Sequence, residues 1–176
     1  MSVQYNVATL LKEPIGATRE YEIDDSVLID DEPRHQRVAG RTTFLRTKDG
    51  LLVTAHLRGV DREVCSRCLR DVDMPVRVDL EEEFLASVDA NTGAPLPPPE
   101  DKEAFRIDAH HTLDLEEAVR QSWTVALPMQ PLCRPDCRGL CPSCGQDLNQ
   151  RACGCAAEED SRWSALEQLV LKLEGK

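Results

Sequence analysis

The chain has 176 residues, 41% of them hydrophobic and 30% charged, a composition that is typical of one folded domain with a small appendage and that excludes a disordered chain. No apolar run approaches the roughly 20 residues that span a bilayer, so the sequence predicts no membrane-spanning helix. The formal net charge of −11 opposes general binding to a phosphate backbone, and aromatic residues, at 4%, are too few for a module that stacks on single-stranded bases.

The N-terminal part is predicted to supply buried residues and a first strand. Residues 3–11 form a short apolar segment in which Leu10 and Leu11 are expected to be buried. Tyr21 and Ile23 then alternate with acidic residues, and this period of two is typical of a half-buried strand.

The middle of the chain is predicted to form an antiparallel sheet. Two β-prone runs, Val38–Leu45 and Leu51–Leu57, flank Lys48-Asp49-Gly50, and Asp-Gly between such runs indicates a β-hairpin. A third alternating run, Met74–Leu80, continues as far as Leu85 and is predicted to be another antiparallel strand.

A loop and a helix follow the predicted sheet. Residues 88–104 are rich in proline, which neither a strand ladder nor a helix interior accommodates, so a flexible loop is expected. Residues 114–126 are predicted to be a helix because acids occupy its first turn and Leu115, Val119 and Trp123 recur at helical spacing.

The predicted fold class is α+β: an antiparallel β-sheet or small open barrel with two packing helices and a C-terminal, cysteine-rich zinc knuckle. The second helix is predicted within residues 158–176, capped by Asp160 or Ser161, and is expected to pack back on the body. The predicted organisation is therefore a β-rich body at 1–127, with the loop at 88–104 and the helix at 114–126, a zinc-binding segment at 128–157 and the C-terminal helix at 158–176.

Six of the eight cysteines lie between Pro131 and Cys155. A Cys-x-x-Cys-Gly sequence, at residues 141–145, lets two thiolates converge on one ion from a tight turn, and structural zinc takes four such ligands in a tetrahedron. Cys141 and Cys144 are predicted to supply two ligands. Two readings remain open for the other half of the site: Cys133 with Cys137, or Cys153 with Cys155.

Clustered cysteines can also form disulfides, hold an iron–sulfur cluster or act as a redox pair. The N-terminus has no apolar segment for export, so a reducing cytoplasmic compartment is expected, and disulfides are disfavoured there. The spacings do not match the ferredoxin runs of iron–sulfur proteins. Cys65 and Cys68 lie in a predicted strand-to-strand connection and are interpreted as a possible second metal half-site or as a redox pair whose thiolate Arg67 would favour.

Several stretches together resemble the YceD family, described as large ribosomal RNA subunit accumulation proteins. The resemblance covers most of the chain and fails only across the acidic segment and the proline-rich loop. A serine, Ser161, stands where the family pattern has proline before Arg162-Trp163. The matching stretches are residues 6–14 and 16–21 (NVATLLKEP and GATREY), Cys65-Ser66-Arg67-Cys68-Leu69 with Glu82-Glu83-Phe84, Ile107-Asp108, residues 113–120 (LDLEEAVR), residues 127–133 (LPMQPLC), residues 137–149 (CRGLCPSCGQDLN) and Arg162-Trp163-Ser164-Ala165-Leu166.

The resemblance implies a cytoplasmic, non-enzymatic factor in the biogenesis of the large ribosomal subunit. Its implied partners are ribosomal RNA or a large-subunit ribosomal protein, with no membrane and no small-molecule substrate. In agreement, the sequence contains no Ser/His/Asp constellation, no phosphate-binding glycine loop and no paired acids at a recognisable spacing. The cysteine regions are the least acidic parts of the chain, and partner contact is expected from Arg67, Arg70, Arg134 and Arg138.

Two rival functions come from other classes. One is a thiol redox protein that uses Cys65 and Cys68, and the other is a zinc-stabilised adaptor that binds only protein. In the favoured mechanism, zinc makes rigid a segment that has too few apolar residues to order itself.

Overall fold

The structure is a computed structural model that describes residues 3–29 and 35–155. It divides into two compact units. The first, here called the sheet unit, comprises Met1–Val64 and Asp71–Pro131, and the second, the cysteine unit, comprises Cys65–Arg70 and Leu132–Lys176. The predicted C-terminal helix lies outside the described residues. The six residues Cys65–Arg70 are the connection between two strands of the sheet unit, although they belong to the cysteine unit.

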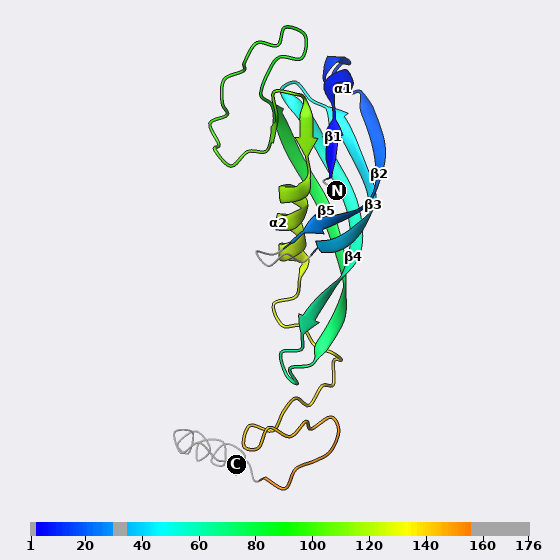
Figure 1. Cartoon of the computed structure of the whole chain (residues 1–176), viewed down its shortest axis with the longest axis vertical. Helices are drawn as coiled ribbons and strands as arrows, with labels where there is room; N and C mark the ends of the chain where they lie inside the picture. The colour runs from blue at the N-terminus through cyan, green and yellow to red at the C-terminus, as the bar shows by residue number, and fades with distance from the viewer. Residues whose placement is uncertain (1–2, 30–34, 156–176) are drawn as a thin grey trace, which may run out of the picture. The chain divides into compact units, whose positions relative to one another are not determined.

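A five-stranded sheet dominates the sheet unit (Figure 1). The strands pair in the order of the sequence, and every neighbouring pair is antiparallel except the last, β5–β6, which is parallel. The α+β class with an open, curved sheet is therefore confirmed. The strands are β2 (Thr18–Leu28), β3 (His35–Arg46), β4 (Gly50–Val64), β5 (Asp71–Ala86) and β6 (Arg106–Ile107).

The hairpin predicted at residues 48–50 joins β3 to β4, with Arg46 opposite Leu51. Both strands extend beyond the predicted runs because β4 pairs along its whole length with β5, down to Val64 opposite Asp71. The short parallel pairing with β6 was not predicted, since a strand of two residues has no detectable periodicity.

Four shorter elements complete the sheet unit. Strands β1 (Gln4–Asn6) and β7 (Thr112–Asp114) form a separate antiparallel pair. Helix α1 (Ala8–Lys12), which was not predicted, carries Leu10 and Leu11, and both are buried as expected. Helix α2 (Glu116–Ala126) begins two residues later than predicted, because Asp114 ends β7 and its carboxylate accepts a hydrogen bond from the Glu116 amide at 2.9 Å.

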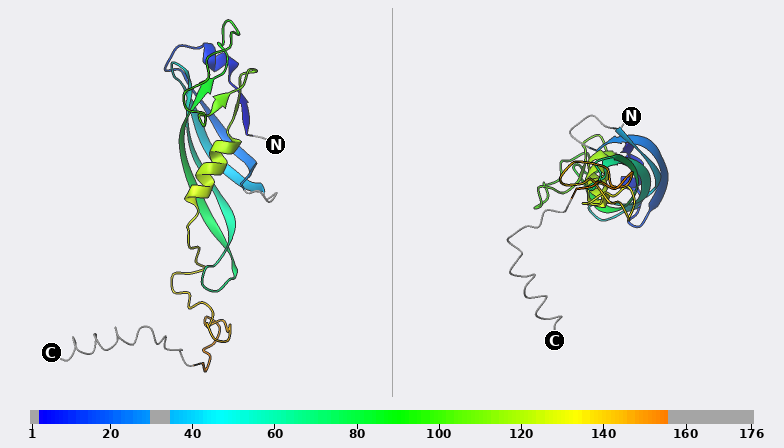
Figure 2. Two further views of the ribbon diagram at one scale, coloured as in Figure 1. Left: turned by 90° about the vertical axis from the view of Figure 1, so that its left-hand side faces the viewer. Right: turned by 90° about the horizontal axis from the view of Figure 1, so that it is seen from below.

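The sheet curves around α2, as both views in Figure 2 show. The predicted stripe of Leu115, Val119 and Trp123 is fully buried against it. The indole Nε1 of Trp123 donates a hydrogen bond to the buried carboxylate of Asp61 on β4 at 2.7 Å. Gly59 leaves room for this ring, since a Cβ there would lie 2.5 Å from the Trp123 Cη2 atom. The central helix is thus fixed by one buried polar contact within an apolar core.

The remaining segments contain little regular structure. Residues 88–104 form neither helix nor strand apart from one bridge between Val88 and Pro95, as their composition predicted. In the cysteine unit, the described residues 132–155 contain a single bridge, Leu140 opposite Asp147. Neither helix of the described ranges has the length and apolarity to cross a membrane.

Candidate metal centre

The connection between β4 and β5 is a tight six-residue loop that starts with a cysteine. The Cys65 amide donates to the Arg70 carbonyl, and the Leu69 amide donates back to the Cys65 carbonyl, both at 2.9 Å. This folding brings the side chains of Cys65 and Cys68 to the same side of the loop. It also forces Leu69 into the left-handed region, at φ 57°, which is uncommon for a residue with a Cβ.

Residues 141–146 repeat this geometry in a second loop. The Cys141 amide donates to the Gln146 carbonyl at 2.8 Å, and the Gly145 amide donates to the Cys141 carbonyl at 2.9 Å. Gly145 has φ 71° and occupies the place of Leu69, without the steric cost that a side chain carries there. Each loop is also closed by an antiparallel pair, Val64–Asp71 in one and Leu140–Asp147 in the other. The chain therefore contains two matching cysteine knuckles.

The structure gathers all eight cysteines into two groups of four. We call these the Cys65 group and the Cys141 group. Within each group the four Sγ atoms all lie within 4.8 Å of one another. The Cys65 group consists of Cys65, Cys68, Cys133 and Cys137, and the Cys141 group consists of Cys141, Cys144, Cys153 and Cys155.

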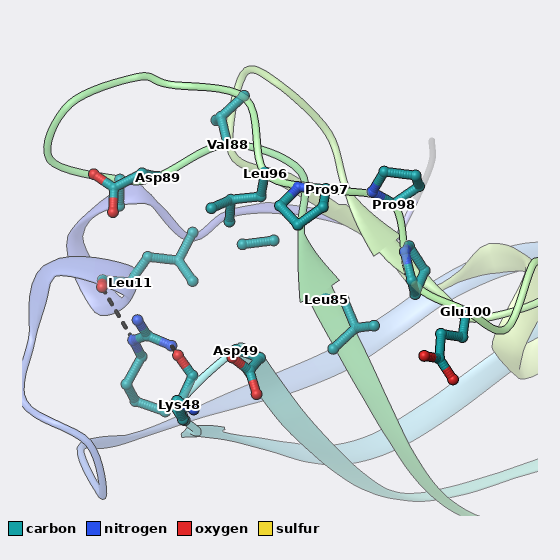
Figure 3. Close-up of a pocket in the computed structure, with 14 residues that line it drawn as sticks. Leu11, Lys48, Asp49, Leu85, Val88, Asp89, Leu96, Pro97, Pro98 and Glu100 are labelled. Atoms are coloured by element: carbon teal, nitrogen blue, oxygen red, sulfur yellow. Dashed lines mark hydrogen bonds between the residues drawn. The ribbon is translucent and has the colours of Figure 1, made fainter.

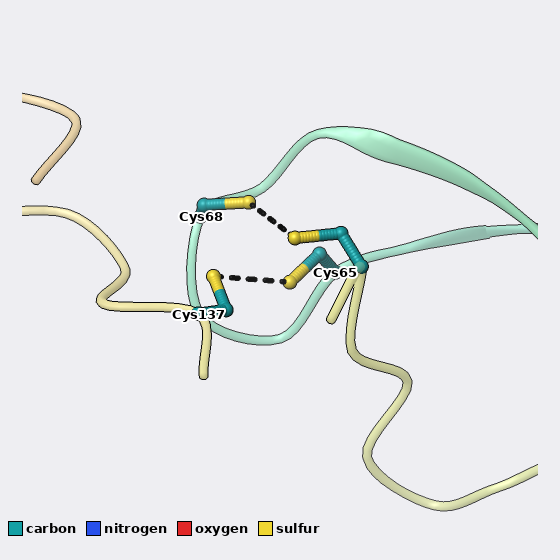
Figure 4. A group of neighbouring side chains, drawn as sticks. Cys65, Cys68 and Cys137 are labelled. Atoms are coloured by element: carbon teal, nitrogen blue, oxygen red, sulfur yellow. Dashed lines mark hydrogen bonds between the residues drawn. The ribbon is translucent and has the colours of Figure 1, made fainter. Parts of the chain in front are cut away.

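The sulfur spacing of the Cys65 group fits a single tetrahedral ion. The side chains of Cys65, Cys68 and Cys137 converge in Figure 4. The Sγ atoms of Cys65 and Cys137 are 3.9 Å apart, and those of Cys68 and Cys133 are 3.7 Å apart. Four thiolates at about 2.3 Å from a zinc ion are about 3.8 Å apart along the edges of a tetrahedron. All eight cysteines are free of disulfides. The residues present therefore match the donor set of a structural zinc site.

In both groups the pKa values of the closely spaced thiols are shifted in opposite directions. Backbone amides lower the pKa of the first cysteine of each knuckle to about 6, through the amide of Cys133 for Cys65 and the amide of Cys144 for Cys141. In the opposite direction, burial raises the pKa of Cys133 to about 12, and the neighbouring Cys144 side chain raises the pKa of Cys155 to about 12. The four thiols of each group resist full ionisation because neighbouring thiolates repel one another. A divalent cation would offset this repulsion.

Polar side chains hold the Cys65 group from outside. Arg67 donates from its guanidinium to the Cys137 carbonyl at 2.9 Å. The backbone amide of Arg70, and next its guanidinium, lower the pKa of the Cys68 thiol, while the same guanidinium lies 3.6 Å from the Asp147 carboxylate. Asn149 donates from Nδ2 to the Cys137 sulfur at 3.4 Å, and its Oδ1 accepts from the Arg138 amide at 2.9 Å. Outer contacts of this kind orient metal ligands.

The predicted arginines have different surroundings. Arg67 and Arg70 are engaged within the cysteine unit, as described above. Arg134 donates to the Asn149 side-chain oxygen at 2.8 Å and lies 3.4 Å from Asp136. Among the residues that the structure describes, the exposed Arg138 guanidinium has no hydrogen-bond or ion-pair partner. Arg138 is therefore the most accessible of the four for a partner.

The grouping of the cysteines in the structure can be compared with the two readings that the sequence left open. Cys153 and Cys155 join Cys141 and Cys144, as one of the two open readings held. The other reading, that Cys133 and Cys137 complete that half-site, does not describe the geometry, because these two lie with Cys65 and Cys68. Asn149 and Asp147 were not singled out as site residues. Their only signal was their position in the CPSCGQDLN stretch.

The sheet unit contains a separate cavity of about 500 Å³ (Figure 3). The proline-rich loop contributes Leu96 and Pro97, which lie opposite Leu11 of α1 and Leu85 of β5. Lys48, Asp49, Asp89 and Glu100 also line it. This lining has no nucleophile paired with a base, and it contains no cysteine or histidine.

The fold and the cysteine groups define a β-rich protein with a cysteine-bearing appendage. The family described as large ribosomal RNA subunit accumulation protein YceD matches residues 53–170, a span that includes both knuckles. The chain belongs to the YceD family, which confirms the resemblance read from the sequence. The description of the family refers to accumulation of a ribosomal RNA subunit and not to a reaction.

Curated relatives extend the match without assigning a function. Uncharacterized proteins of Mycobacterium tuberculosis and Mycobacterium bovis are each 33% identical over 148 residues, which are 84% of this chain and 65% of the relative. An uncharacterized protein of Mycobacterium leprae is 36% identical over 84 residues, 48% of this chain and 36% of that protein. The chain thus spans less than two thirds of the length of these relatives. No solved structure matches it.

Proposed function

We propose that this chain is a non-enzymatic, cytoplasmic factor for biogenesis of the large ribosomal subunit, and that zinc ions bound by its cysteines stabilise the surface that contacts ribosomal RNA or a ribosomal protein. The family match over residues 53–170 supports the ribosomal part of the proposal most strongly. The metal part has independent support in the geometry of the two cysteine groups.

Zinc is the metal that best suits this donor set. Four thiolates in a tetrahedron bind zinc in closed structural sites, where no ligand position is left for water or substrate. Sulfur atoms within 4.8 Å of one another leave room for one ion and not for a cluster of several irons. A closed site of this kind stabilises a fold and supplies no chemistry, in keeping with a non-enzymatic protein.

The described part of the cysteine unit, residues 65–70 and 132–155, contains no large apolar cluster that could order it without such an ion. Its buried cluster among the described residues consists of Cys65, Cys68 and Cys137, with Leu132 and Cys133 partly buried against them. Zinc binding contributes about 10 kcal/mol or more to the folding of isolated zinc peptides. Metal binding would therefore replace hydrophobic burial as the force that orders this unit.

Charge supports a contact through the cysteine unit. The chain as a whole carries −11, whereas Arg138 and the exposed Arg151 lie on the described surface of this unit. An arginine without an internal partner can form charge-assisted hydrogen bonds to phosphates or to carboxylates. Arg138 is the residue that we propose makes this contact.

Sedimentation of a cell extract tests the ribosomal role. We expect the protein to travel with precursors of the large subunit, and Arg138→Glu to shift it toward the top of the gradient. Arg77→Glu is the matched control, because Arg77 is an equally exposed arginine on the sheet unit. Protein that never sediments with immature large particles would refute the proposal.

Affinity purification with and without nuclease separates the two kinds of partner. Loss of the co-purifying ribosomal proteins after nuclease treatment indicates that RNA is contacted, and their retention indicates a protein-binding adaptor. A redox role would instead require Cys65 or Cys68 to react with iodoacetamide in the native protein. Both are almost completely buried, at 0% and 4% exposure, so we expect slow labelling despite their lowered thiol pKa values.

A further inference from the structure

The two cysteine groups differ in their exposure to solvent. In the Cys65 group three cysteines are between 0% and 4% exposed, and Cys133 is half-buried. In the Cys141 group only Cys141 is buried, at 6%, while Cys144 and Cys155 are exposed. Two cysteines of the Cys141 group are therefore exposed to reagents in solution, whereas every cysteine of the Cys65 group is buried or half-buried.

The surroundings of the two groups reinforce this difference. Cys144, Cys153 and Cys155 line an open hollow of about 410 Å³, and a side chain built on the neighbouring Gly154 would meet no atom within 4 Å. The Cys65 group is instead covered by Leu132 and held by the contacts of Arg67 and Asn149 with Cys137. No side-chain donor to a sulfur atom outside the cysteines themselves is found for the Cys141 group among the described residues.

We infer that the Cys141 group is a labile metal site, which hydroperoxides oxidise with release of its zinc, whereas the Cys65 group keeps its ion as the permanent anchor of the cysteine unit. The inference rests on the proposed zinc binding. It deepens that proposal, because it divides the eight ligands between a stable site and a responsive one.

The oxidation is a two-electron step at exposed thiolates. The sulfur of Cys144 or Cys155 attacks one oxygen of hydrogen peroxide, the O–O bond breaks, and a sulfenic acid forms with release of hydroxide. A second thiolate of the group attacks that sulfur, a disulfide forms, and a second hydroxide leaves. Two thiolates, one peroxide and two protons thus give one disulfide and two waters. Zinc left with two ligands dissociates into solution.

The geometry allows this disulfide to form locally. All four sulfur atoms of the Cys141 group lie within 4.8 Å of one another, and three of them are in or next to open space. Oxidation would open the second knuckle, which lies within eight residues of Arg138. A protein that contacts its partner through Arg138 would then lose affinity under oxidising conditions and regain it after reduction and zinc rebinding.

The test uses the full zinc-loaded chain and a chromogenic zinc chelator. Hydrogen peroxide is added, and released zinc and free thiols are followed together. We expect the zinc ion of the Cys141 group to be released at least ~10-fold faster than that of the Cys65 group. Hydrogen bonds around metal ligands change metal affinity on this scale. Peptide mass spectrometry should place the first disulfide within residues 141–155, and a thiol reductant with zinc should reverse the change.

Two variants assign the fast and slow ions. Cys144→Ser should remove the fast phase and leave one slowly released ion, whereas Cys68→Ser should leave one ion that is released rapidly. Cys155→Ser repeats the first variant in case Cys144→Ser fails to fold. Equal release of both ions, or a first disulfide among the cysteines of the Cys65 group, would overturn the inference while leaving zinc binding intact. Protein that binds no zinc at all would overturn the proposed metal binding and, with it, this inference.

Discussion

The sheet unit and the cysteine unit are ordered by different forces. The sheet unit buries a continuous cluster of aliphatic and aromatic side chains, in which Trp123, Phe44 and Phe84 are the largest. Among the described residues, the buried cluster of the cysteine unit consists of cysteine side chains, with one leucine, Leu132, packed against them. Hydrophobic burial stabilises the sheet unit, whereas under the proposed metal binding an ion would make burial of the thiolates of the cysteine unit favourable.

Removal of metal should produce the largest difference in stability between the two units. With a strong chelator under reducing conditions, we expect amides of residues 132–155 to lose their protection from hydrogen exchange, because zinc contributes about 10 kcal/mol or more to such folds. Strands β3, β4 and β5 should stay protected. Continued protection of the Cys141 and Gly145 amides in metal-free protein would contradict the dependence on an ion.

The complementary perturbation is made in the core of the sheet unit. Trp123→Ala should lower the free energy of unfolding by about 3–5 kcal/mol, because it empties the space around α2 and leaves the Asp61 carboxylate without its indole donor. Urea unfolding followed by far-UV circular dichroism measures this loss. Val125→Ala on the same helix is the control, since Val125 is 85% exposed, and a comparable loss there would argue against the buried packing of Trp123.

A smaller effect is expected from the outer contacts of the Cys65 group. Asn149→Ala removes the donor to the Cys137 sulfur and the acceptor for the Arg138 amide, and should weaken binding of the slowly released ion by about 10–100-fold. Competition with a chelator of known affinity measures the change. Gln150→Ala is the neighbouring control, because its side-chain amide makes only a long hydrogen bond, 3.3 Å, to the Asp147 carboxylate. An effect confined to the rapidly released ion would contradict the contact of Asn149 with the Cys65 group.

The smallest effects should distinguish the two knuckles from each other. Leu69→Gly relieves the left-handed conformation of an exposed leucine and should stabilise the metal-bound protein, whereas Gly145→Leu should destabilise it, each by about 1–2 kcal/mol. Thermal unfolding in excess zinc compares the pair. Shifts of the same sign in both variants would show that the two loops do not share one geometry.

Local patterns in the sequence were sufficient to predict most of the sheet unit. The alternation around Tyr21 and Ile23, the Asp-Gly hairpin and the helical stripe ending at Trp123 are signals contained within a few residues, and each is confirmed. Helix α1 was missed because five residues are too few for a helical period to be recognised. The contact of Trp123 with Asp61 joins residues 62 positions apart and leaves no local signal.

The grouping of the cysteines also depends on contacts between residues that are far apart in the sequence. The knuckle at residues 141–145 was recognised from its glycine, and its partners Cys153 and Cys155 were one of two open choices. The Cys65 group combines a loop between two strands with a segment that follows α2, so its assembly depends on the path of the whole sheet. From the sequence, Cys65 and Cys68 were interpreted as a possible second metal half-site or as a redox pair, and Leu69 stands where the other knuckle has Gly145.

The separation of Cys68 and Cys133 along the chain has a consequence for the denatured protein. These cysteines are 65 residues apart, and β5, the proline-rich loop and α2 all lie between them. An ion that stays bound while the rest of the chain unfolds turns this stretch into a ring. The lost freedom of that ring would add at most about 4 kcal/mol to the stability of the enclosed elements, as for a covalent cross-link of the same span. A metal ion bound in the cysteine unit would thereby raise the melting temperature of the sheet unit.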